Sequence, residues 1–381
     1  MRLFKECDDT AFWTDPSEGF RRLFAAGERV LRAPDAAFCV FGHRELIALA
    51  REPTVEGVPV AADAFGEHTQ LAALYGAGLF AGAGPSHRYA RRAALAGLGV
   101  APVALRATEI EALVERALSG CPVGTPFDLA QDLIAPLTAR IWARLAGYPA
   151  DAETALAQAV AILADPDADL VSQAAAAGRV RELTITAWQS GASPFMRAIA
   201  DALPSGSACE PAPLVASMAV DGIDSAAAGL AGALAILAHQ PPDTVARFGV
   251  EACLQEALRL AMPVILSMRR ATQDVSCGEV GFPRGTILWM WWGAGCVDPR
   301  AYPAPNRFLP GRGGPRAPVF GAGAHACLGH VLIRTAALPL ISGAFGGMGQ
   351  LVAAGPASPS QPWRLSRLPR QTVLWRARSQ A

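Results

Sequence analysis

Lysine is nearly absent from this chain: Lys5 is the only lysine, and the rest of the positive charge is arginine. The 33 basic residues are matched by 33 acidic residues, so the formal net charge is zero. Proteins that bind nucleic acids usually carry a basic surplus on one face. The charge balance therefore gives no indication of a nucleic-acid partner.

Long apolar runs and a leader sequence are also lacking. Residues 1–10 carry charges of both signs, which does not fit a signal peptide. The longest uncharged apolar run, residues 225–238, is shorter than the roughly 20 residues that cross a bilayer. The eight cysteines are scattered without paired spacing, as expected of reduced thiols. We therefore expect a cytoplasmic protein with no membrane segment.

Composition and periodicity favour one large helical domain. The chain has 381 residues, of which 52% are hydrophobic, and no linker-like break or repeat divides it. Apolar periodicity predicts helices over most of the length, with short β-rich runs near residues 30–41, 262–269 and 286–292. The expected fold is mainly α with a small β-rich region, in a single domain over residues 1–381.

A lone cysteine, Cys327, ends a glycine-rich loop just before a predicted helix over residues 328–345. The unpaired N–H groups and the dipole at the start of a helix favour thiolate over thiol. A thiolate held in this way is a nucleophile, a zinc ligand or the axial ligand of a haem iron.

The spacing of this loop resembles the haem-ligand loop of the cytochrome P450 family. The pattern is Phe, two residues, Gly, one residue, His, one residue, Cys, one residue, Gly, and its fixed positions are Phe320, Gly323, His325, Cys327 and Gly329. The resemblance implies an α-helical prism with a long central helix over haem b. It also implies that the Cys327 thiolate is the axial ligand of the haem iron.

Three basic residues suit the two haem propionates. His87 and Arg91 lie four residues apart on a predicted helix and so project from one face, and the family places a His and an Arg at this spacing for the propionates. The family also has a propionate-binding Arg at the end of a pocket-lining strand. Arg270 alternates to the other face of that strand, so we choose Arg269.

The apolar stretch 214–238 is interrupted by Asp221, Asp224 and Ser225. Charged residues inside a buried helix need a reason. By resemblance, Asp224 and Ser225 hold water and relay protons to oxygen, although the family usually has Thr in place of Ser225. Asp221 stands where the family usually has Ala or Gly. Its alternatives are an ester to the haem, an anchor for a cationic or hydroxylated substrate, and a bond to an Arg.

Further positions follow from the same resemblance. Glu256 and Arg259, three apart on a predicted helix over residues 251–261, match the pair that braces the haem loop. The irregular stretch 53–84 corresponds to the roof of the substrate pocket, and a hairpin over 350–376 has its tip near residues 365–367. The expected substrate contacts are Leu79, Phe80, Val220, Asp221, Val264 and Ile265.

The expected function is oxidation of a small, largely apolar substrate by O2. Electrons would come from NAD(P)H through a ferredoxin or flavodoxin and its reductase, because the chain leaves no room for a flavin or ferredoxin domain. The partner would dock on a basic face that includes some of Arg88, Arg92, Arg312 and Arg316.

Three alternatives stay open. One is peroxide-driven or non-oxygenating haem-thiolate chemistry, and another is a haem-based sensor or binding protein, against which the pair Asp224 and Ser225 argues. The last is a zinc site of His325, Cys327 and His330, which lacks a fourth ligand.

Overall fold

The computed structural model describes residues 4, 12–13, 15–33, 35–61, 63–207, 209–357 and 366–377. The chain divides into two compact units, each assembled from three separated stretches. The first unit contains Met1–Val58, Ala228–Cys327 and Leu351–Val373, and the second contains Pro59–Ala227, Leu328–Gln350 and Leu374–Ala381. Because neither unit is a continuous segment, this division does not define two sequence domains. The expected single domain stays a prediction.

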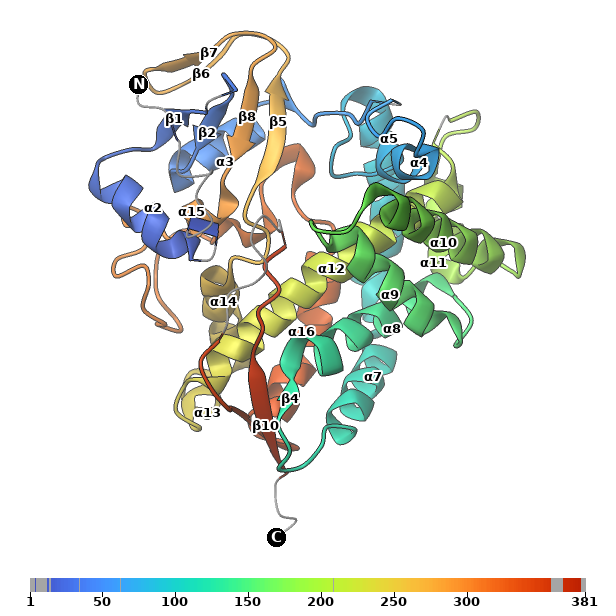
Figure 1. Ribbon diagram of the computed structural model, residues 1–381, viewed down its shortest axis with the longest axis vertical. Coiled ribbons are helices and arrows are strands. Elements are labelled where there is room, and N and C mark those ends of the chain that lie inside the picture. The colour runs from blue at the N-terminus through green and yellow to red at the C-terminus, as the bar shows by residue number, and fades with distance from the viewer. Residues whose placement is uncertain are drawn as a thin grey trace. The chain divides into compact units, whose positions relative to one another are not determined.

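The first unit contains most of the β structure. Five strands form a sheet in the order β1-β2-β8-β5-β3, in which β2 and β8 are parallel and the other pairs are antiparallel (Figure 1). Strands β6 and β7 form a separate hairpin. The strands are β1 (Val30–Arg32), β2 (Phe38–Val40), β3 (Val55–Glu56), β5 (Ser267–Ala271), β6 (Val275–Cys277), β7 (Val280–Phe282) and β8 (Ile287–Met290).

Short helices and turns complete the first unit. At the start of α2 the Asp15 side chain accepts a hydrogen bond from the N–H of Ser17 at 3.1 Å, and Pro16 takes the first helical position. The helical segments are α2 (Pro16–Ala25), α3 (His43–Arg51), α13 (Thr244–Phe248), α14 (Val250–Ala261), α15 (Trp292–Cys296) and the 3₁₀ turns η3 (Pro318–Phe320) and η4 (Gly323–His325).

The core of the first unit is unusually aromatic. Trp291, which is fully buried, lies 5.4 Å from the ring of Phe4, 5.6 Å from that of Phe12 and 5.8 Å from that of Phe41, measured between ring centroids. Aromatic pairs at such separations stabilise a core beyond their buried area. A second cluster joins buried side chains of the sheet with Leu46 and Leu49 of α3.

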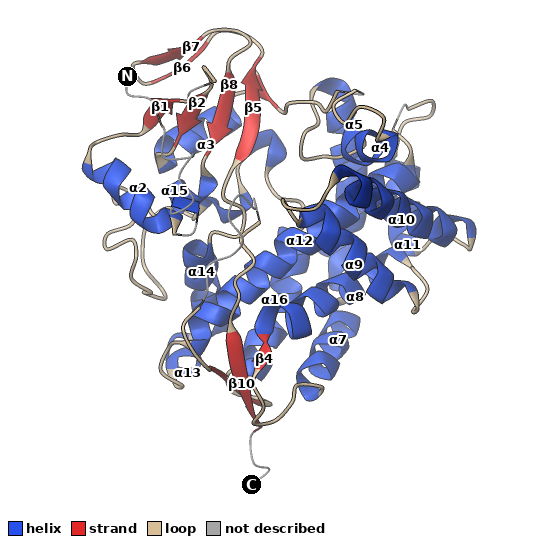
Figure 2. Cartoon of the chain, viewed as in Figure 1, coloured by secondary structure: helices blue, strands red, loops and turns tan. Residues whose placement is uncertain are grey.

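The second unit is almost entirely helical (Figure 2). Helix α9 packs against α10 and α8, α5 against α11, and α7 against α16. One helix, α4, lies inside the stretch 53–84, which we expected to be irregular. Its helical segments are α4 (Thr69–Gly76), α5 (Gly84–Leu98), α6 (Val100–Ala104), α7 (Ala107–Ser119), the π-helical turn η2 (Leu129–Ile134), α8 (Ala135–Ala146), α9 (Ala152–Ala164), α10 (Leu170–Gln189), α11 (Pro194–Ala202) and α16 (His330–Ala344).

A small sheet of three strands has the order β4-β10-β9. Its strands are β4 (Phe127–Asp128), β9 (Gly349–Ala353) and β10 (Thr372–Ala377). Strands β9 and β10 are the two arms of the expected hairpin over 350–376. Most of the loop that joins them, residues 358–365, lies outside the described residues, and so does Leu365 of the expected tip.

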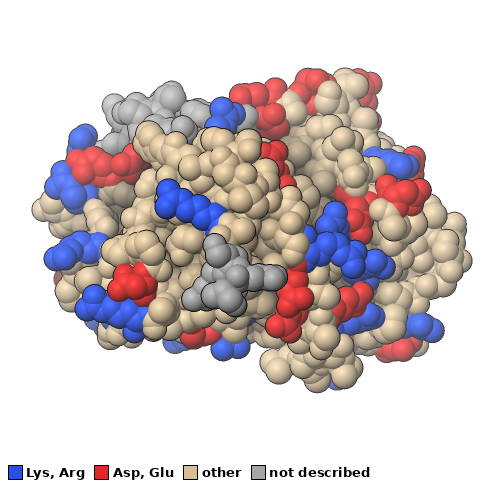
Figure 3. Space-filling model, turned by 90° about the horizontal axis from the view of Figure 1, so that it is seen from below, with Lys and Arg blue, Asp and Glu red and all other residues tan. Residues whose placement is uncertain are grey.

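The longest helix is α12 (Pro211–Ala238), with 28 residues, and it agrees with the predicted apolar helix. In the described part of the chain, α12 is the one unbroken helix that is long and apolar enough to cross a membrane, and 67% of its most apolar window is buried within the protein. A core helix of this composition passes the same test. On the face drawn in Figure 3, acidic and basic side chains are interspersed.

Candidate functional site

The cysteine loop lies in the first unit, and only its last two residues, Leu328 and Gly329, belong to the second. The N–H of Cys327 donates to the carbonyl of Phe320 at 2.8 Å, and the N–H of Ala326 donates to that of Gly323 at 3.1 Å. These bonds close a tight turn before α16, which begins at His330. The Cys327 side chain is exposed and is not part of a disulfide.

Gly323 fixes the path of this loop. Its φ of 65° lies in the left-handed region that glycine adopts without strain. A Cβ added at Gly323 would overlap with the carbonyl oxygen of Ala50 in α3. The loop therefore lies directly on the backbone of α3, and no larger residue fits at this position.

Arg269 lies on β5 with its side chain buried, at 5% exposure. Burial lowers the pKa of its guanidinium to about 10. One of its terminal nitrogens donates to the carbonyl of Met268 at 2.6 Å. Exposure alternates along β5, so that Arg269 is buried and Arg270 is exposed. The propionate-binding role chosen for Arg269 stays a prediction.

The cysteine loop and Arg269 fit a haem. An accessible thiol is the donor that a haem-thiolate site needs, and the close approach of Gly323 to Ala50 sets the backbone that presents it. A buried guanidinium gains from an anionic partner such as a propionate. These residues belong to one unit.

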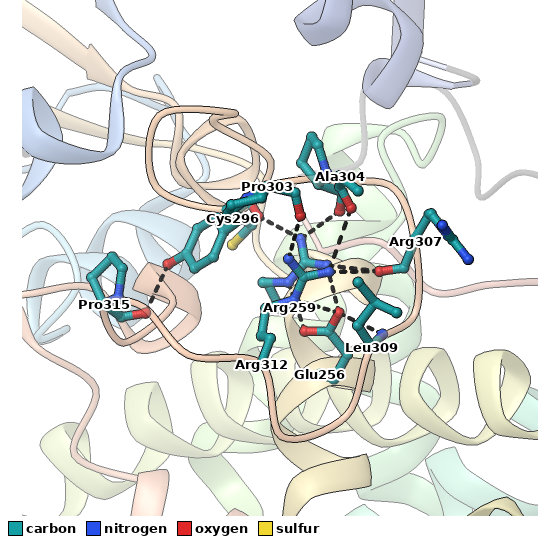
Figure 4. A network of polar contacts seen from close by, with 11 residues as sticks. Glu256, Arg259, Cys296, Pro303, Ala304, Arg307, Leu309, Arg312 and Pro315 are labelled. Carbon is teal, nitrogen blue, oxygen red and sulfur yellow. Dashed lines mark hydrogen bonds and ion pairs between the residues drawn. The ribbon is translucent and has the colours of Figure 1, made fainter.

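A buried ion pair lies behind this loop on α14, where the side chains of Glu256 and Arg259 are 3% and 2% exposed. Arg259 donates to the two carboxylate oxygens of Glu256, at 2.8 Å each (Figure 4). Such a two-pronged pair is the strong form of an ion pair. The predicted Glu256–Arg259 pair is thus present, and it is buried.

The same pair holds the chain between residues 296 and 312. Arg259 donates to the carbonyls of Cys296 at 2.8 Å and Pro305 at 2.7 Å, while Glu256 accepts the N–H of Leu309 at 3.0 Å. This irregular segment therefore takes hydrogen bonds from α14 in place of a strand neighbour.

Arg312 belongs to this network (Figure 4), which corrects its expected role in docking a partner. Its Nε donates to Glu256 at 2.8 Å, and its terminal nitrogens donate to the carbonyls of Pro303 and Arg307 at 2.8 Å. Its side chain is 12% exposed. A guanidinium committed to these bonds offers little charge to a partner. Arg316 is exposed, as are Arg88 and Arg92 on α5.

The three polar residues of α12 lie in the second unit and are partly buried. The hydroxyl of Ser225 donates to the backbone carbonyl of Asp221 at 2.5 Å. Because its proton is used in this bond, the Ser225 oxygen is left as an acceptor. Burial, and then the charge of Asp224, raise the pKa of Asp221 to about 7.

His87 and Arg91 lie on α5, also in the second unit. His87 is 6% exposed, and a Cβ added at Gly82 would come within 2.8 Å of its ring. Arg91 is partly exposed. They sit one helical turn apart, as predicted. Their assembly with Cys327 and Arg269 around one haem stays a prediction.

The predicted substrate residues differ in accessibility. In the second unit Phe80 is 44% exposed, Leu79 is partly buried, and Val220 is 7% exposed within the helical core. In the first unit Ile265 is 1% exposed and packs in the aromatic core. Val264 is partly exposed and forms an antiparallel bridge with Ser366. Of Val264 and Ile265, Val264 is therefore the residue with accessible surface.

One buried acid was missed by sequence reasoning. Asp298, at 1% exposure, accepts hydrogen bonds from the N–H of His43 at 3.0 Å and of Arg300 at 2.9 Å. It ties the start of α3 to the chain after α15. An Asp-Pro pair at 298–299 marked a turn in the sequence, but nothing there named His43 as its partner. As for metals, the described ranges contain no group of three or more His, Cys, Asp and Glu side chains placed to bind an ion.

Comparison with known proteins identifies related sequences. The family model of cytochrome P450 matches residues 249–336. Cytochrome P450 CYP199A2 of Rhodopseudomonas palustris is 33% identical over 131 residues, or 33% of this chain and 32% of that protein. The beta-dihydromenaquinone-9 omega-hydroxylase of Mycobacterium tuberculosis is 33% identical over 101 residues, or 26% of this chain and 19% of that protein. This chain thus spans under a third of either relative.

Solved structures match over nearly the full chain. CalO2 has a TM-score of 0.84 at 20% identity, covering 98% of this chain and 99% of that one. P450BioI in complex with a hexadecenoic acid-ligated acyl carrier protein has a TM-score of 0.83 at 18% identity, covering 96% of this chain and 100% of that one. At these identities the likeness shows a shared fold, and the expected fold class is confirmed.

Proposed function

Since the chain belongs to the cytochrome P450 family, we propose that it is a haem-thiolate monooxygenase acting on a small, largely apolar substrate. The reaction inserts one oxygen atom from O2, by hydroxylation or epoxidation. The name of the mycobacterial relative, an omega-hydroxylase, supports hydroxylation.

The observation that carries this proposal is the exposed thiol of Cys327, on a turn held by its own backbone hydrogen bonds and seated on α3. A haem bound through a thiolate supplies oxygen activation, because the thiolate donates electron density that favours cleavage of the O–O bond. The hydrogen bonds of Arg259 and Glu256 keep the segment before this turn in place.

The residues that would hold the haem divide into three groups. Cys327 is the iron ligand, and its loop is shaped by the other fixed positions of the motif. Arg269, His87 and Arg91 balance the propionates. The loop positions are Phe320, Gly323, His325 and Gly329.

Proton handling falls to Asp224 and Ser225 on α12. Because the Ser225 hydroxyl donates to the Asp221 carbonyl, its oxygen would accept a hydrogen bond from water. Asp224 is the acid next to it in sequence. Their role is to hold and move protons within an apolar helix.

Electrons come from NAD(P)H through a separate ferredoxin or flavodoxin and its reductase. Exposed Arg88 and Arg92 on α5 suit an acidic partner, and so does Arg316 in the first unit. None of the seven described cysteines is in a disulfide, which supports a reducing, cytoplasmic location.

The ligand assignment is tested with the reduced carbon-monoxide complex, whose red-shifted Soret band gives the family its name. The protein should show this band, and Cys327→Ala should abolish it. Cys277→Ala is the matched control, because Cys277 is another free and partly exposed thiol in the first unit. A band that survives Cys327→Ala would disprove the ligand.

The reaction type is tested separately with isotopically labelled O2 and a substitute redox chain. The product should carry one labelled oxygen atom. Product formed with peroxide alone, and none with O2 and electrons, would instead identify the peroxide-driven alternative.

A further inference from the structure

Within the described part of the chain, Asp221 is a carboxylate without a counter-charge. It lies on α12, where the other charged residue is Asp224, and the helix carries no basic residue. Among the residues that the structure describes, none donates a hydrogen bond to the Asp221 carboxylate or forms an ion pair with it. Its helix neighbours Val220 and Ile223 are 7% and 4% exposed and belong to the helical core. A partly buried acid in such surroundings is destabilised unless something compensates its charge.

One aromatic side chain of α4, Tyr75, lies near enough to this acid to feel its charge. The pKa of the Tyr75 phenol is raised to about 12 by burial and by the charges of Asp221 and Asp224. The ring of Tyr75 lies 5.7 Å from that of Phe65. The turn after α4 also packs on α12, because a Cβ added at Gly78 would come within 2.7 Å of the Ser217 hydroxyl, one turn before Asp221.

The two carboxylates and the aromatic ring of Tyr75 favour a ligand that carries a positive charge. Two carboxylates three residues apart repel an anion and gain from a cation, more strongly in an apolar site than in water. Aromatic rings also attract a cationic nitrogen through their faces. A neutral hydroxyl could bond to Asp221, but it would leave the charge of the acid uncompensated.

Resting on the proposed monooxygenase function, we infer that Asp221 and Tyr75 bind the cationic nitrogen of the substrate. The substrate class is therefore an apolar molecule that carries a protonated or quaternary amine. Anchoring the nitrogen at one end fixes which carbon atom is presented for oxidation.

The pH dependence of binding follows from the groups at this site. Because its pKa is about 7, Asp221 is mostly protonated at pH 6 and mostly ionised at pH 8. Asp224 is the charged group that acts on it from the same helix, and Tyr75 from α4 stays neutral over this range. Affinity for a permanent cation should therefore rise between pH 6 and 8.

The test compares phenyltrimethylammonium with tert-butylbenzene, which replaces the nitrogen by carbon, and with benzoate as the anion. The quaternary nitrogen has no lone pair and cannot ligate iron. Affinities of the haem-loaded protein are measured by equilibrium dialysis, which needs no turnover. The cation should bind about tenfold or more tightly than its neutral counterpart, and benzoate most weakly.

Three variants locate the effect. Asp221→Asn should bring the cation and the neutral compound to similar affinity and remove the pH dependence, whereas Asp221→Glu should keep the preference. Glu210→Gln, which removes an exposed carboxylate just before α12, should behave as the parent protein. An unchanged Soret band in each variant shows that the haem site is intact.

Two outcomes overturn the inference: equal affinity of the parent protein for the cation and its neutral counterpart, or a cation preference that survives Asp221→Asn. Failure of the monooxygenase proposal would be seen in different measurements. The carbon-monoxide band would be missing, or the product would carry no labelled oxygen, whatever ligand is bound.

Discussion

Glu256 and Arg312, 56 residues apart in sequence, meet at 2.8 Å, on the same carboxylate that already binds Arg259. One acid thus carries two guanidinium groups. The α14 pair alone would be a local feature of one helix. With Arg312 added, it fixes a long irregular segment to α14, because both arginines also donate to carbonyls of that segment.

Breaking this network should lower the free energy of unfolding of the protein. Glu256→Gln removes the charge that compensates two arginines, one of which is almost fully buried, so the free energy of unfolding should fall by about 3–5 kcal/mol. Denaturant titration measures it. The matched control is Glu18→Gln, since Glu18 and Arg21 have the same spacing but are 39% and 57% exposed. That change should have little effect. Similar losses in both variants would contradict the assigned role of burial.

The cysteine loop should not accept a side chain at Gly323. Gly323→Ala combines left-handed strain with overlap on Ala50, so we expect a loss of about 3 kcal/mol or more, together with poor haem retention. Gly311→Ala separates these causes. Its φ is 76° and an added Cβ meets nothing within 4 Å, so strain alone should cost about 1–2 kcal/mol. Equal effects would exclude the contact with Ala50 as the cause.

Removing the Ser225 hydroxyl should uncouple electron use from product. Ser225→Ala should keep substrate affinity but lower the product formed per NAD(P)H and raise peroxide, with proton-transfer effects of up to about 10²–10⁴-fold as the scale. Ser225→Thr keeps the hydroxyl and should stay coupled. Simultaneous assays of NAD(P)H, peroxide and product decide this. Unchanged coupling in the Ala variant would leave water as the proton source.

Stability should depend on pH through Asp221. Folding raises its pKa from 3.8 to about 7, so the folded state holds a proton that the unfolded state has lost between these values. Stability from this group is therefore full below about pH 4 and declines as pH rises through 7. Asp221→Asn should thus be more stable than the parent at pH 8, by at most about 4 kcal/mol, and similar at pH 4. Identical pH profiles would show that Asp221 is not shifted.

Reversing exposed charge on α5 should slow electron delivery. Arg88→Glu with Arg92→Glu should lower the rate of reduction by an acidic ferredoxin about tenfold at low salt, with a smaller difference at high salt. Arg179→Glu reverses another exposed charge, on α10, and should leave the rate unchanged. Stopped-flow reduction under carbon monoxide measures it. Equal rates at low salt would place the docking face elsewhere.

Features that depend on nearby residues were predictable from the sequence, whereas contacts between residues far apart in the sequence were not. The spacing of Glu256 and Arg259 placed them on one helix face, and strand alternation selected Arg269 over Arg270. The contact of Arg312 with Glu256 depends on how the irregular chain folds back on α14. No short-range sequence pattern predicts that path. Helix α4 was not predicted, because the Gly- and Ala-rich sequence around it is typical of a loop. Its ends are set by packing, with Leu71 and Leu74 buried in the helical core.

The interleaving of the two units has a consequence for the order of synthesis. The first unit needs residues 1–58, but their partners in 228–327 follow the whole central part of the second unit. Neither unit is complete until residues beyond 350 have left the ribosome. Contacts between stretches so far apart close slowly and leave apolar surface exposed meanwhile. The aromatic side chains of Phe12 and Phe20 are therefore synthesised long before Trp291, against which they pack, and stay exposed until then. A chaperone that shields them during translation should raise the yield of folded protein.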